Sequence, residues 1–405
     1  MRYDYPIALD EKGRAIFPEG VTFIREGEFT LMRAWNGILL PKSLIHIAEE
    51  AFRECEWIRS VHIPEAVEFI GRGAFAGCFS IREITVSPKN KHYRSEGNCL
   101  LSADGKTLYL GCRNSVIPPT VERIDDEAFR GCRFLEEITI PEGVKEIGDW
   151  TFCHCANLKA VHFPSTLRKI GNGAFWGCKR LLSVDLPDGL TTLGAESFGL
   201  CTALEKVLVP DKVSYLGEGL FNLCSGIESL QVAPLNPYFR SEGNCILSDD
   251  GKTLLEGCSA SVVPEGVEKL RAFAFSGRNS LRVITLPEGV KEIGEEAFCR
   301  CTNLSRVSLP KSLSVIGSVA FEECSSLEEL DIPEGVTLIY VSAFCACTSL
   351  TKMNLYPSTP PDTFITEEDG FYAVDVEITV PPGRKDAYES DGFFAYCSSI
   401  EERPE

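Results

Sequence analysis

Phenylalanine recurs along this chain of 405 residues at a fixed interval of 23 residues. Two intervals of 54 residues interrupt the series, and each is the sum of 23 and 31. The series consists of Phe29, Phe52, Phe75, Phe129, Phe152, Phe175, Phe198, Phe221, Phe275, Phe298, Phe321 and Phe344. A side chain that returns at a fixed period marks a repeat architecture, in which small units stack on their neighbours. The period therefore predicts a fold that grows in one dimension.

Proline keeps the same register, eleven residues before each phenylalanine. It shifts by one residue at Pro88, Pro234 and Pro357, where an ordinary unit does not follow. We therefore expect a single solenoid domain over residues 1–405. Residues 1–17 would form an N-terminal cap, 18–356 the repeat coils and 357–405 a C-terminal capping region.

One unit shows how a coil can be built. In residues 158–164, LKAVHFP, apolar residues alternate as in a short strand that closes at a proline. A second short extended segment follows, in which Leu167 and Ile170 point inward before a glycine turn. Phe175 and Cys178 fill the remaining corner. Because no unit can bury these side chains alone, the coils must stack, and the fold class is a β-rich solenoid of 23-residue coils.

The two longer units, of 31 residues, are near copies of each other. The segment RSEGNCLLS at 94–102 is followed by DGKTL, and the same pattern returns 146 residues later, from 240. Two apolar runs around Asp-Gly predict a β-hairpin. DGKT also invites comparison with the phosphate-binding P-loop, but that motif needs a glycine where Leu100 and Ile246 stand. These two coils are therefore predicted to carry hairpins, not nucleotide sites.

The repeat has the consensus L-x-x-[VI]-x-[LIF]-P-x-x-[LV]-x-x-I-G-x-x-A-F-x-x-C, as in IPEGVKEIGDWTFCHC and LPEGVKEIGEEAFCRC. With this pattern the chain resembles the BspA-type leucine-rich repeat proteins. The RSEGNC and DGKTL segments look like a variant coil of that family. The tail at 378–388, ITVPPGRKDAY, is similar to the family's C-terminal cap and is followed by Phe394-Ala395-Tyr396-Cys397.

The resemblance implies a leucine-rich repeat array and a non-enzymatic interaction protein of a family that is often exported and tied to adhesion. The N-terminal sequence MRYDYPIALDEKG lacks the pattern of a signal peptide, so the chain as given is expected to be cytoplasmic. Export remains the alternative that the family suggests. No apolar run reaches the length that spans a bilayer, so membrane insertion is not expected.

Charge limits the partners of the chain. A net charge of -19 repels phosphates, which argues against nucleic acid and anionic membranes as partners. No sequence pattern calls for a cofactor. The expected partner is a protein or, alternatively, a cell-surface glycan.

Eighteen cysteines could indicate disulfides, a metal site or buried thiols, and TFCHC at 151–155 looks most like a metal site. However, Cys155 belongs to a ladder that keeps register with the phenylalanines: Cys55, Cys78, Cys132, Cys155, Cys178, Cys201, Cys224, Cys301, Cys324 and Cys347. Free cysteine behaves as a small buried hydrophobe. Cys153 also recurs, but His154 between the two thiols is replaced in other coils. We therefore expect core packing and no metal.

Two cysteine pairs are the best disulfide candidates, because each would lie across a hairpin. They are Cys99 with Cys112 and Cys245 with Cys258. Without an export signal we favour free thiols at all four positions.

Catalysis has little support in the sequence. The five histidines are scattered over distant coils, and none of the common hydrolase or metalloprotease motifs is present. Acidic pairs such as Glu136-Glu137 read as solvated faces. We expect no catalytic residues and no enzyme.

The candidate binding surface is the face of the strands that points away from the core, since solenoids bind partners on such faces. Its residues are His62, Thr85, Thr139, His162, Asp185, Leu208, Gln231, Thr285, Ser308, Asp331 and Asn354. This face is polar and poor in aromatics. The sequence therefore favours a binding surface no more than a sheet surface that only contacts solvent. Trp57, Trp150 and Trp176 form a second candidate patch at turn positions.

Two functions follow from this sequence. The first is a non-catalytic protein–protein interaction scaffold that binds its partner through the strand face. The alternative is a carbohydrate- or cell-surface-binding adhesin module.

Overall fold

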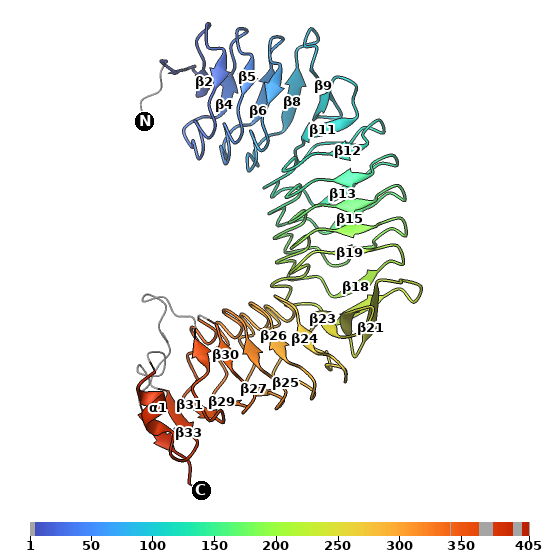
Figure 1. Ribbon diagram of the computed structural model, residues 1–405. Helices are drawn as coiled ribbons and strands as arrows, with labels where there is room; N and C mark the ends of the chain where they lie inside the picture. Colours follow the sequence, from blue (N-terminus) through green and yellow to red (C-terminus); the bar gives the residue numbers. More distant parts are fainter. Residues whose placement is uncertain (1–4, 341, 364–375, 392–398, 405) are drawn as a thin grey trace. The chain divides into compact units, whose positions relative to one another are not determined.

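A computed structural model describes residues 5–340, 342–363, 376–391 and 399–404. The fold is a β-solenoid of about 16 turns with a spacing of about 23 residues, which confirms the predicted fold class. Each turn adds short strands beside those of the preceding turn (Figure 1). Contacts divide the chain into two compact units. The first comprises Met1–Cys201 and Tyr215–Gly217, and the second comprises Thr202–Ser214 and Glu218–Glu405.

The first unit begins with an antiparallel hairpin in which β1 (Ala8–Leu9) pairs with β2 (Arg14–Ile16). Its other strands of three or four residues outside the long coil are β4 (Gly37–Leu39), β6 (Ser60–Ile63), β8 (Glu83–Val86), β13 (Glu137–Thr139) and β15 (Ala160–His162). Its two-residue strands are β3 (Phe23–Ile24), β5 (His46–Ile47), β7 (Phe69–Ile70), β12 (Arg123–Ile124), β14 (Glu146–Ile147), β16 (Lys169–Ile170), β17 (Thr192–Leu193) and β19 (Tyr215–Leu216).

The second unit repeats this plan and contains a short helix, α1 (Lys385–Glu389), before its last strand. Its longer strands outside the long coil are β18 (Lys206–Val209), β20 (Ser229–Val232), β25 (Val283–Thr285), β27 (Arg306–Ser308), β29 (Glu329–Ile332), β31 (Lys352–Leu355), β33 (Glu377–Val380) and β34 (Ser399–Glu402). Its two-residue strands are β24 (Lys269–Leu270), β26 (Glu292–Ile293), β28 (Val315–Ile316), β30 (Leu338–Ile339) and β32 (Asp362–Thr363).

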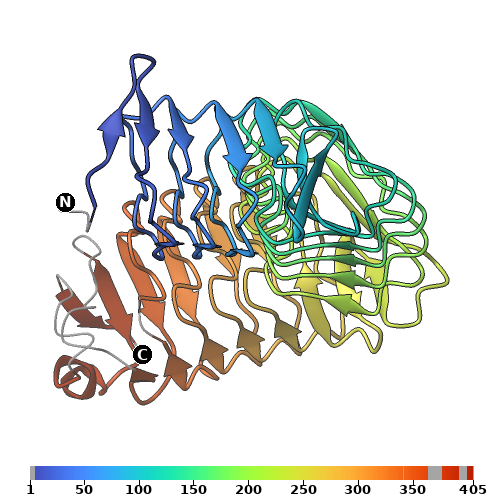
Figure 2. The same ribbon diagram turned by 90° about the horizontal axis from the view of Figure 1, so that it is seen from above.

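Consecutive coils pair in parallel with a register of one repeat. Ile138 lies opposite Val161 in the longer strands, and Ile147 lies opposite Ile170 in the shorter ones. A third row of hydrogen bonds joins the phenylalanine corners, as from the Phe152 N–H to the Ala174 carbonyl at 2.7 Å. Figure 2 shows the successive coils of each unit stacked in this way.

The core is a column of identical corners. The rings of successive phenylalanines stack, with centroids 5.1 Å apart for Phe152 and Phe175 and 5.3 Å apart for Phe175 and Phe198. Leu167 and Ile170 are buried as predicted, whereas Phe163 is only half-buried. The recurring side chains therefore hold one coil on the next.

Two residues in every ordinary coil have a left-handed backbone, two residues before and two residues after the phenylalanine. In the coil of Phe152 they are Trp150, with φ of 56°, and His154, with φ of 59°. Side chains other than glycine are strained there. The sequence pattern does not reveal this geometry, because only some coils place glycine at these positions.

Val319 is the β-branched residue in this row, with φ of 48°. Val319→Gly should raise the free energy of unfolding by about 0.5–1 kcal/mol, since relief of backbone strain exceeds the entropy that glycine adds to the unfolded chain. Urea unfolding checks this. Lys311→Gly, at a residue outside the left-handed region, should instead be neutral or destabilising. A loss of stability in Val319→Gly would contradict the interpretation.

Each 31-residue coil folds as a three-stranded antiparallel meander. In the first unit its strands are β9 (Tyr93–Glu96), β10 (Cys99–Ser102) and β11 (Thr107–Leu110), and in the second they are β21 (Phe239–Glu242), β22 (Cys245–Ser248) and β23 (Thr253–Glu256). The hairpin around Asp-Gly is the predicted one. The preceding hairpin, at Gly97-Asn98, was not predicted. There the Asn98 side chain accepts a hydrogen bond from the Ile84 N–H at 2.8 Å.

The C-terminal segment continues the ladder of strands. Strand β33 pairs with β31, and β34 pairs with β33. Tyr388 of α1 is fully buried, and its hydroxyl donates to the Pro357 carbonyl at 2.9 Å. The segment Phe394–Cys397, which the sequence comparison singled out, lies outside the described residues.

Candidate functional site

The predicted strand face is largely solvent-exposed. Thr85 and Asn354 are half-buried, and the other nine of its residues are exposed. Ten of the eleven lie in strands, whereas Asp185 does not. The structure brings them together as cross-strand pairs in separate small sheets: His62 with Thr85, Thr139 with His162, Leu208 with Gln231, Thr285 with Ser308, and Asp331 with Asn354.

Several of these side chains are engaged with one another. His62 Nδ1 lies 3.0 Å from Thr85 Oγ1. The Asn354 amide donates to Asp331 Oδ1 at 2.7 Å and its oxygen accepts from the Thr379 hydroxyl at 2.7 Å. These contacts tie neighbouring strands together, which gives the face a regular polar surface.

The TFCHC motif contains buried cysteines and an exposed histidine. Cys153 and Cys155 are buried, while His154 is exposed on the left-handed turn between them. Among the described residues, no three His, Cys, Asp or Glu side chains gather so that they could hold a metal ion. The turn points the histidine away from the two thiols that flank it in sequence.

The cysteine ladder has a regular hydrogen-bond role. The thiol of Cys155 donates to the Phe129 carbonyl at 3.2 Å, and Cys178 donates to Phe152 at 3.3 Å. The same bond, spanning 26 residues, recurs at Cys55, Cys78, Cys201, Cys301, Cys324 and Cys347. Cysteine suits this corner because it is small and apolar and still satisfies a buried carbonyl.

Burial disfavours the reactive thiolate form of several of these thiols. It raises the pKa of Cys301 and of Cys347 to about 12. Cys345 is half-buried, which leaves it accessible. Alkylation by iodoacetamide at neutral pH should modify Cys345 before Cys301 and Cys347. The latter two should react on the order of 10³-fold more slowly than in denaturant, since only the thiolate reacts. Peptide mapping by mass spectrometry checks the order. Equal rates at Cys345 and Cys301 would contradict it.

The four hairpin cysteines are buried and free. Burial raises the pKa of Cys99 and of Cys245 to about 12. The Cys112 and Cys258 sulfurs each accept a hydrogen bond from an asparagine amide at 3.1 Å. The two meanders are therefore held by the same polar contacts.

The three tryptophans do not form one patch. The rings of Trp150 and Trp176 lie 6.4 Å apart in adjacent coils. Trp57 occupies a different position of the repeat, two residues after a ladder cysteine, and is 49% exposed. Only Trp150 and Trp176 lie close enough to act together.

Sequence reasoning missed an aromatic stack on the two-residue strands β3, β5 and β7. The rings of Phe23 and His46 stack at 4.7 Å, and those of His46 and Phe69 stack at 4.4 Å. Phe23 is 47% exposed and Phe69 is 45% exposed. The signal was available, because the three residues are spaced by 23. Aromatic side chains of this kind are enriched at binding interfaces.

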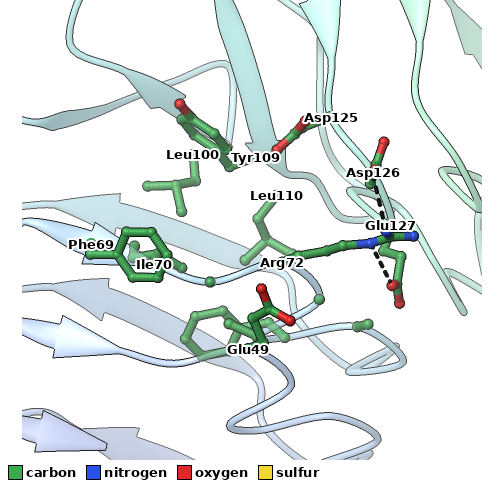
Figure 3. Close-up of a pocket in the computed structure, with 15 residues that line it drawn as sticks. Glu49, Phe69, Ile70, Arg72, Leu100, Tyr109, Leu110, Asp125, Asp126 and Glu127 are labelled. Atoms are coloured by element: carbon green, nitrogen blue, oxygen red, sulfur yellow. Dashed lines mark hydrogen bonds and ion pairs between the residues drawn. The ribbon is translucent and has the colours of Figure 1, made fainter. Parts of the chain in front are cut away.

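The stack ends at a pocket of about 290 Å³, shown in Figure 3. We call it the β7 pocket, and it is lined by Glu49, Phe69, Arg72, Tyr109, Leu110 and Asp125, among others. Strand β7 is the edge of the sheet β3-β5-β7, because the following coil is the meander. The Ile70 N–H is satisfied instead by the Tyr93 hydroxyl at 2.9 Å. The pocket thus lies where the regular ladder is interrupted.

One end of the β7 pocket is closed by ion pairs (Figure 3). The Arg72 guanidinium lies 3.4 Å from Asp126 and 3.2 Å from the buried carboxylate of Glu127. Arg123 lies 3.1 Å from Asp125, and Arg130 lies 3.4 Å from Glu127. Glu49 also lines the pocket and is exposed. The pocket therefore combines apolar side chains with four carboxylates and the Arg72 guanidinium.

The second long coil has a buried ion cluster, formed by Glu256, Arg271 and Arg278. Glu256 and Arg278 are fully buried, and Glu256 lies 3.6 Å from Arg271 and 3.7 Å from Arg278. In the first copy, 146 residues earlier, Leu110, Asp125 and Cys132 stand at these positions. The cluster was missed although the comparison of the two copies signals it.

Arg278 also satisfies the backbone at the position that cysteine holds in other coils. It donates to the carbonyls of Gly257, Phe221, Cys224 and Ser276 at 2.8–3.0 Å. One long side chain therefore does what a short thiol does elsewhere and also lies 3.7 Å from the Glu256 carboxylate.

Burial raises the pKa of Glu256 to about 7, and the two arginines only partly oppose this effect. Its unfolded value is about 4.5. A pKa that is raised on folding stabilises the protein fully below the unfolded value, and this contribution is lost as the pH rises to 7. Relative to Glu256→Gln, the wild type should lose about 3 kcal/mol of stability between pH 4.5 and pH 8. Urea unfolding of both proteins measures this; a constant difference would contradict it.

Among the described residues, no helix combines the length and apolar character that crossing a membrane requires.

Comparison with known proteins assigns the repeat. The BspA type leucine rich repeat region matches in six copies, over residues 13–99, 108–231 and 256–364. A crystal structure of a leucine rich cell surface protein from Faecalibacterium prausnitzii A2-165 is similar, with a TM-score of 0.56 and 22% identity over 98% of this chain and 93% of that chain. The pneumococcal vaccine antigen PcpA is also similar, with a TM-score of 0.51 and 18% identity over 100% of this chain and 98% of that chain. Among curated proteins there is no match. The agreement of repeat, fold and ladder shows that this chain belongs to the BspA-type leucine-rich repeat family.

Proposed function

We propose that the chain is a non-catalytic scaffold that binds a protein partner. The observation that carries the proposal is the aromatic stack of Phe23, His46 and Phe69, whose two phenylalanines are exposed and which ends at the β7 pocket. Hot spots of interfaces are enriched in large side chains that cluster beside well-packed pockets. The fold supports the same reading, since leucine-rich repeat solenoids mediate interactions through extended surfaces.

The polar strand face predicted from the sequence is the second surface of this scaffold. Its residues, from His62 to Asn354, are regularly spaced and mostly exposed. They offer hydrogen bonds without aromatic anchors. Such a surface contributes specificity around an anchor more than affinity.

Site-specific photo-crosslinking separates the two surfaces. A photoreactive phenylalanine analogue replaces His46 in one protein and His162 on the strand face in another, and each is irradiated in lysate of the source cells. We expect a saturable adduct from position 46 that disappears when Phe23 and Phe69 are changed to serine. An adduct from position 162 alone would indicate that the partner binds the strand face and not the aromatic stack. The absence of adducts from both positions would contradict the scaffold.

An adhesin that binds a cell-surface glycan is the second candidate. The observation that favours it is the similarity to the Faecalibacterium prausnitzii protein, which is described as a cell surface protein. A glycan array probed with the intact chain tests it. Binding to a defined glycan class that is lost in Phe69→Ser would support the adhesin, and an array without signal would reject it.

A further inference from the structure

Phe69 presents an open aromatic face to the β7 pocket. One side of its ring is covered by His46, at 4.4 Å between centroids. Among the described residues no further ring stacks on Phe69, because the next coil is the meander, and Phe69 lines the pocket (Figure 3). Tyr109 and Leu110 of β11 line the same pocket. Phe69 therefore belongs both to the end of the stack and to the wall of the pocket.

The charges around this space favour a cation. Glu49, Asp125, Asp126 and Glu127 all line the pocket, and Arg72 is the cation among its lining residues. Arg123 and Arg130 approach Asp125 and Glu127. The sum of these seven groups is one negative charge, and Glu49 is an exposed carboxylate among them. The whole chain adds to this field with a net charge of -19.

The chain itself shows how it covers exposed aromatic rings. Arg113 lies over Phe134 at 5.2 Å, and Arg133 lies over Phe79 at 4.7 Å. In the second unit Arg403 lies over Tyr356 at 3.8 Å. A guanidinium stacks on a ring and still binds carboxylates, which an ammonium group does less well.

We propose that the β7 pocket is an acceptor for an arginine side chain of the protein partner. The guanidinium stacks on Phe69 and pairs with Glu49, while its methylene stem lies along Leu110 and Tyr109. The partner is thus a protein with a basic, arginine-bearing segment. This inference rests on the proposed scaffold function and names the chemistry of its anchor.

The test uses the full chain and a small probe, acetyl-arginine amide, detected by saturation-transfer NMR. Acetyl-citrulline amide, which has the same shape without the charge, and acetyl-lysine amide are the matched probes. We expect saturation of the arginine side-chain protons and clearly weaker signals from both other probes. Equal signals from arginine and citrulline would overturn the proposal and need no variant for their interpretation.

Variants locate the site. Phe69→Leu keeps an apolar side chain but removes the ring, and it should weaken the arginine probe about fivefold. Glu49→Gln should weaken it by a similar factor. Tyr215→Leu, at an exposed aromatic residue on strand β19 of the same unit and outside the pocket lining, is the control and should leave the affinity unchanged. If Tyr215→Leu and Phe69→Leu act alike, the probe binds elsewhere and the proposal fails.

Competition separates this inference from the proposed function. Acetyl-arginine amide should reduce the crosslinked adduct from position 46, whereas acetyl-citrulline amide should not. An adduct that resists the arginine probe would end the arginine assignment and leave the scaffold in place. Failure to form any adduct would instead reject the scaffold itself.

Discussion

Replacing Arg278 by cysteine, the residue of the first copy, should lower the free energy of unfolding by about 3–5 kcal/mol, because Glu256 loses a partner in a fully buried site. The change also removes hydrogen bonds to four backbone carbonyls. Glu256 would then take up a proton, since a buried carboxylate without compensation is neutralised. The loss should thus be larger than the roughly 1 kcal/mol typical of point substitutions.

The two long coils offer a matched test of this interpretation. Glu256→Leu alone should also destabilise the chain, because it leaves two arginines without their carboxylate. The double variant Glu256→Leu, Arg278→Cys restores the first copy's residues at both positions and should recover most of the loss. Urea unfolding of the four proteins gives the coupling free energy.

A control variant shows whether replacing any arginine of this unit by cysteine lowers the stability. Arg282→Cys changes an exposed arginine in the same unit and should alter stability by less than about 0.5 kcal/mol. Strictly additive effects of Glu256→Leu and Arg278→Cys would show that the two residues do not depend on each other. In that case the buried ion cluster would not be a coupled pair.

The period of the sequence predicts much of this fold, because each coil repeats the same burial problem. Phe175 and Cys178 return in register, and both are fully buried. The prediction of a short strand near Val161 and a second one near Ile170 is confirmed. Repetition allows core and strand positions to be assigned even where the sequence of one unit alone would not decide between them.

The 23-residue period does not predict two features of the structure, the left-handed turns and the buried ion cluster. Left-handed turns at Trp150 and His154 depend on backbone geometry that many residue types occupy in this chain. The buried cluster of Glu256 and Arg278 departs from the consensus, so the pattern of apolar positions does not predict it. Departures between near copies are the signal that finds such sites.

The candidate site was predicted only in part. The strand face could be placed from alternation, since its residues follow buried ones in each strand. The β7 pocket could not be placed, because it arises where the meander ends the sheet at Phe69 and brings Tyr109 beside it. Contacts of this kind depend on how an irregular coil packs, which the repeat does not specify.

Deletion of one whole coil should leave a folded solenoid, and this is the second large effect that the structure predicts. Removal of residues 159–181 takes out 23 residues and joins Leu158 to Leu182, so that every later residue keeps its place in the repeat. Each coil contacts mainly its neighbours, and therefore the array closes over the gap. Removal of residues 159–170 takes out about half a coil and moves inward positions to the surface.

Far-UV circular dichroism and urea unfolding of these two deletion proteins test most directly whether the recurring side chains build one stacked column. The account predicts that the protein without residues 159–181 keeps its β spectrum and unfolds cooperatively, while the protein without residues 159–170 does neither. Equal loss of structure in both proteins would contradict it.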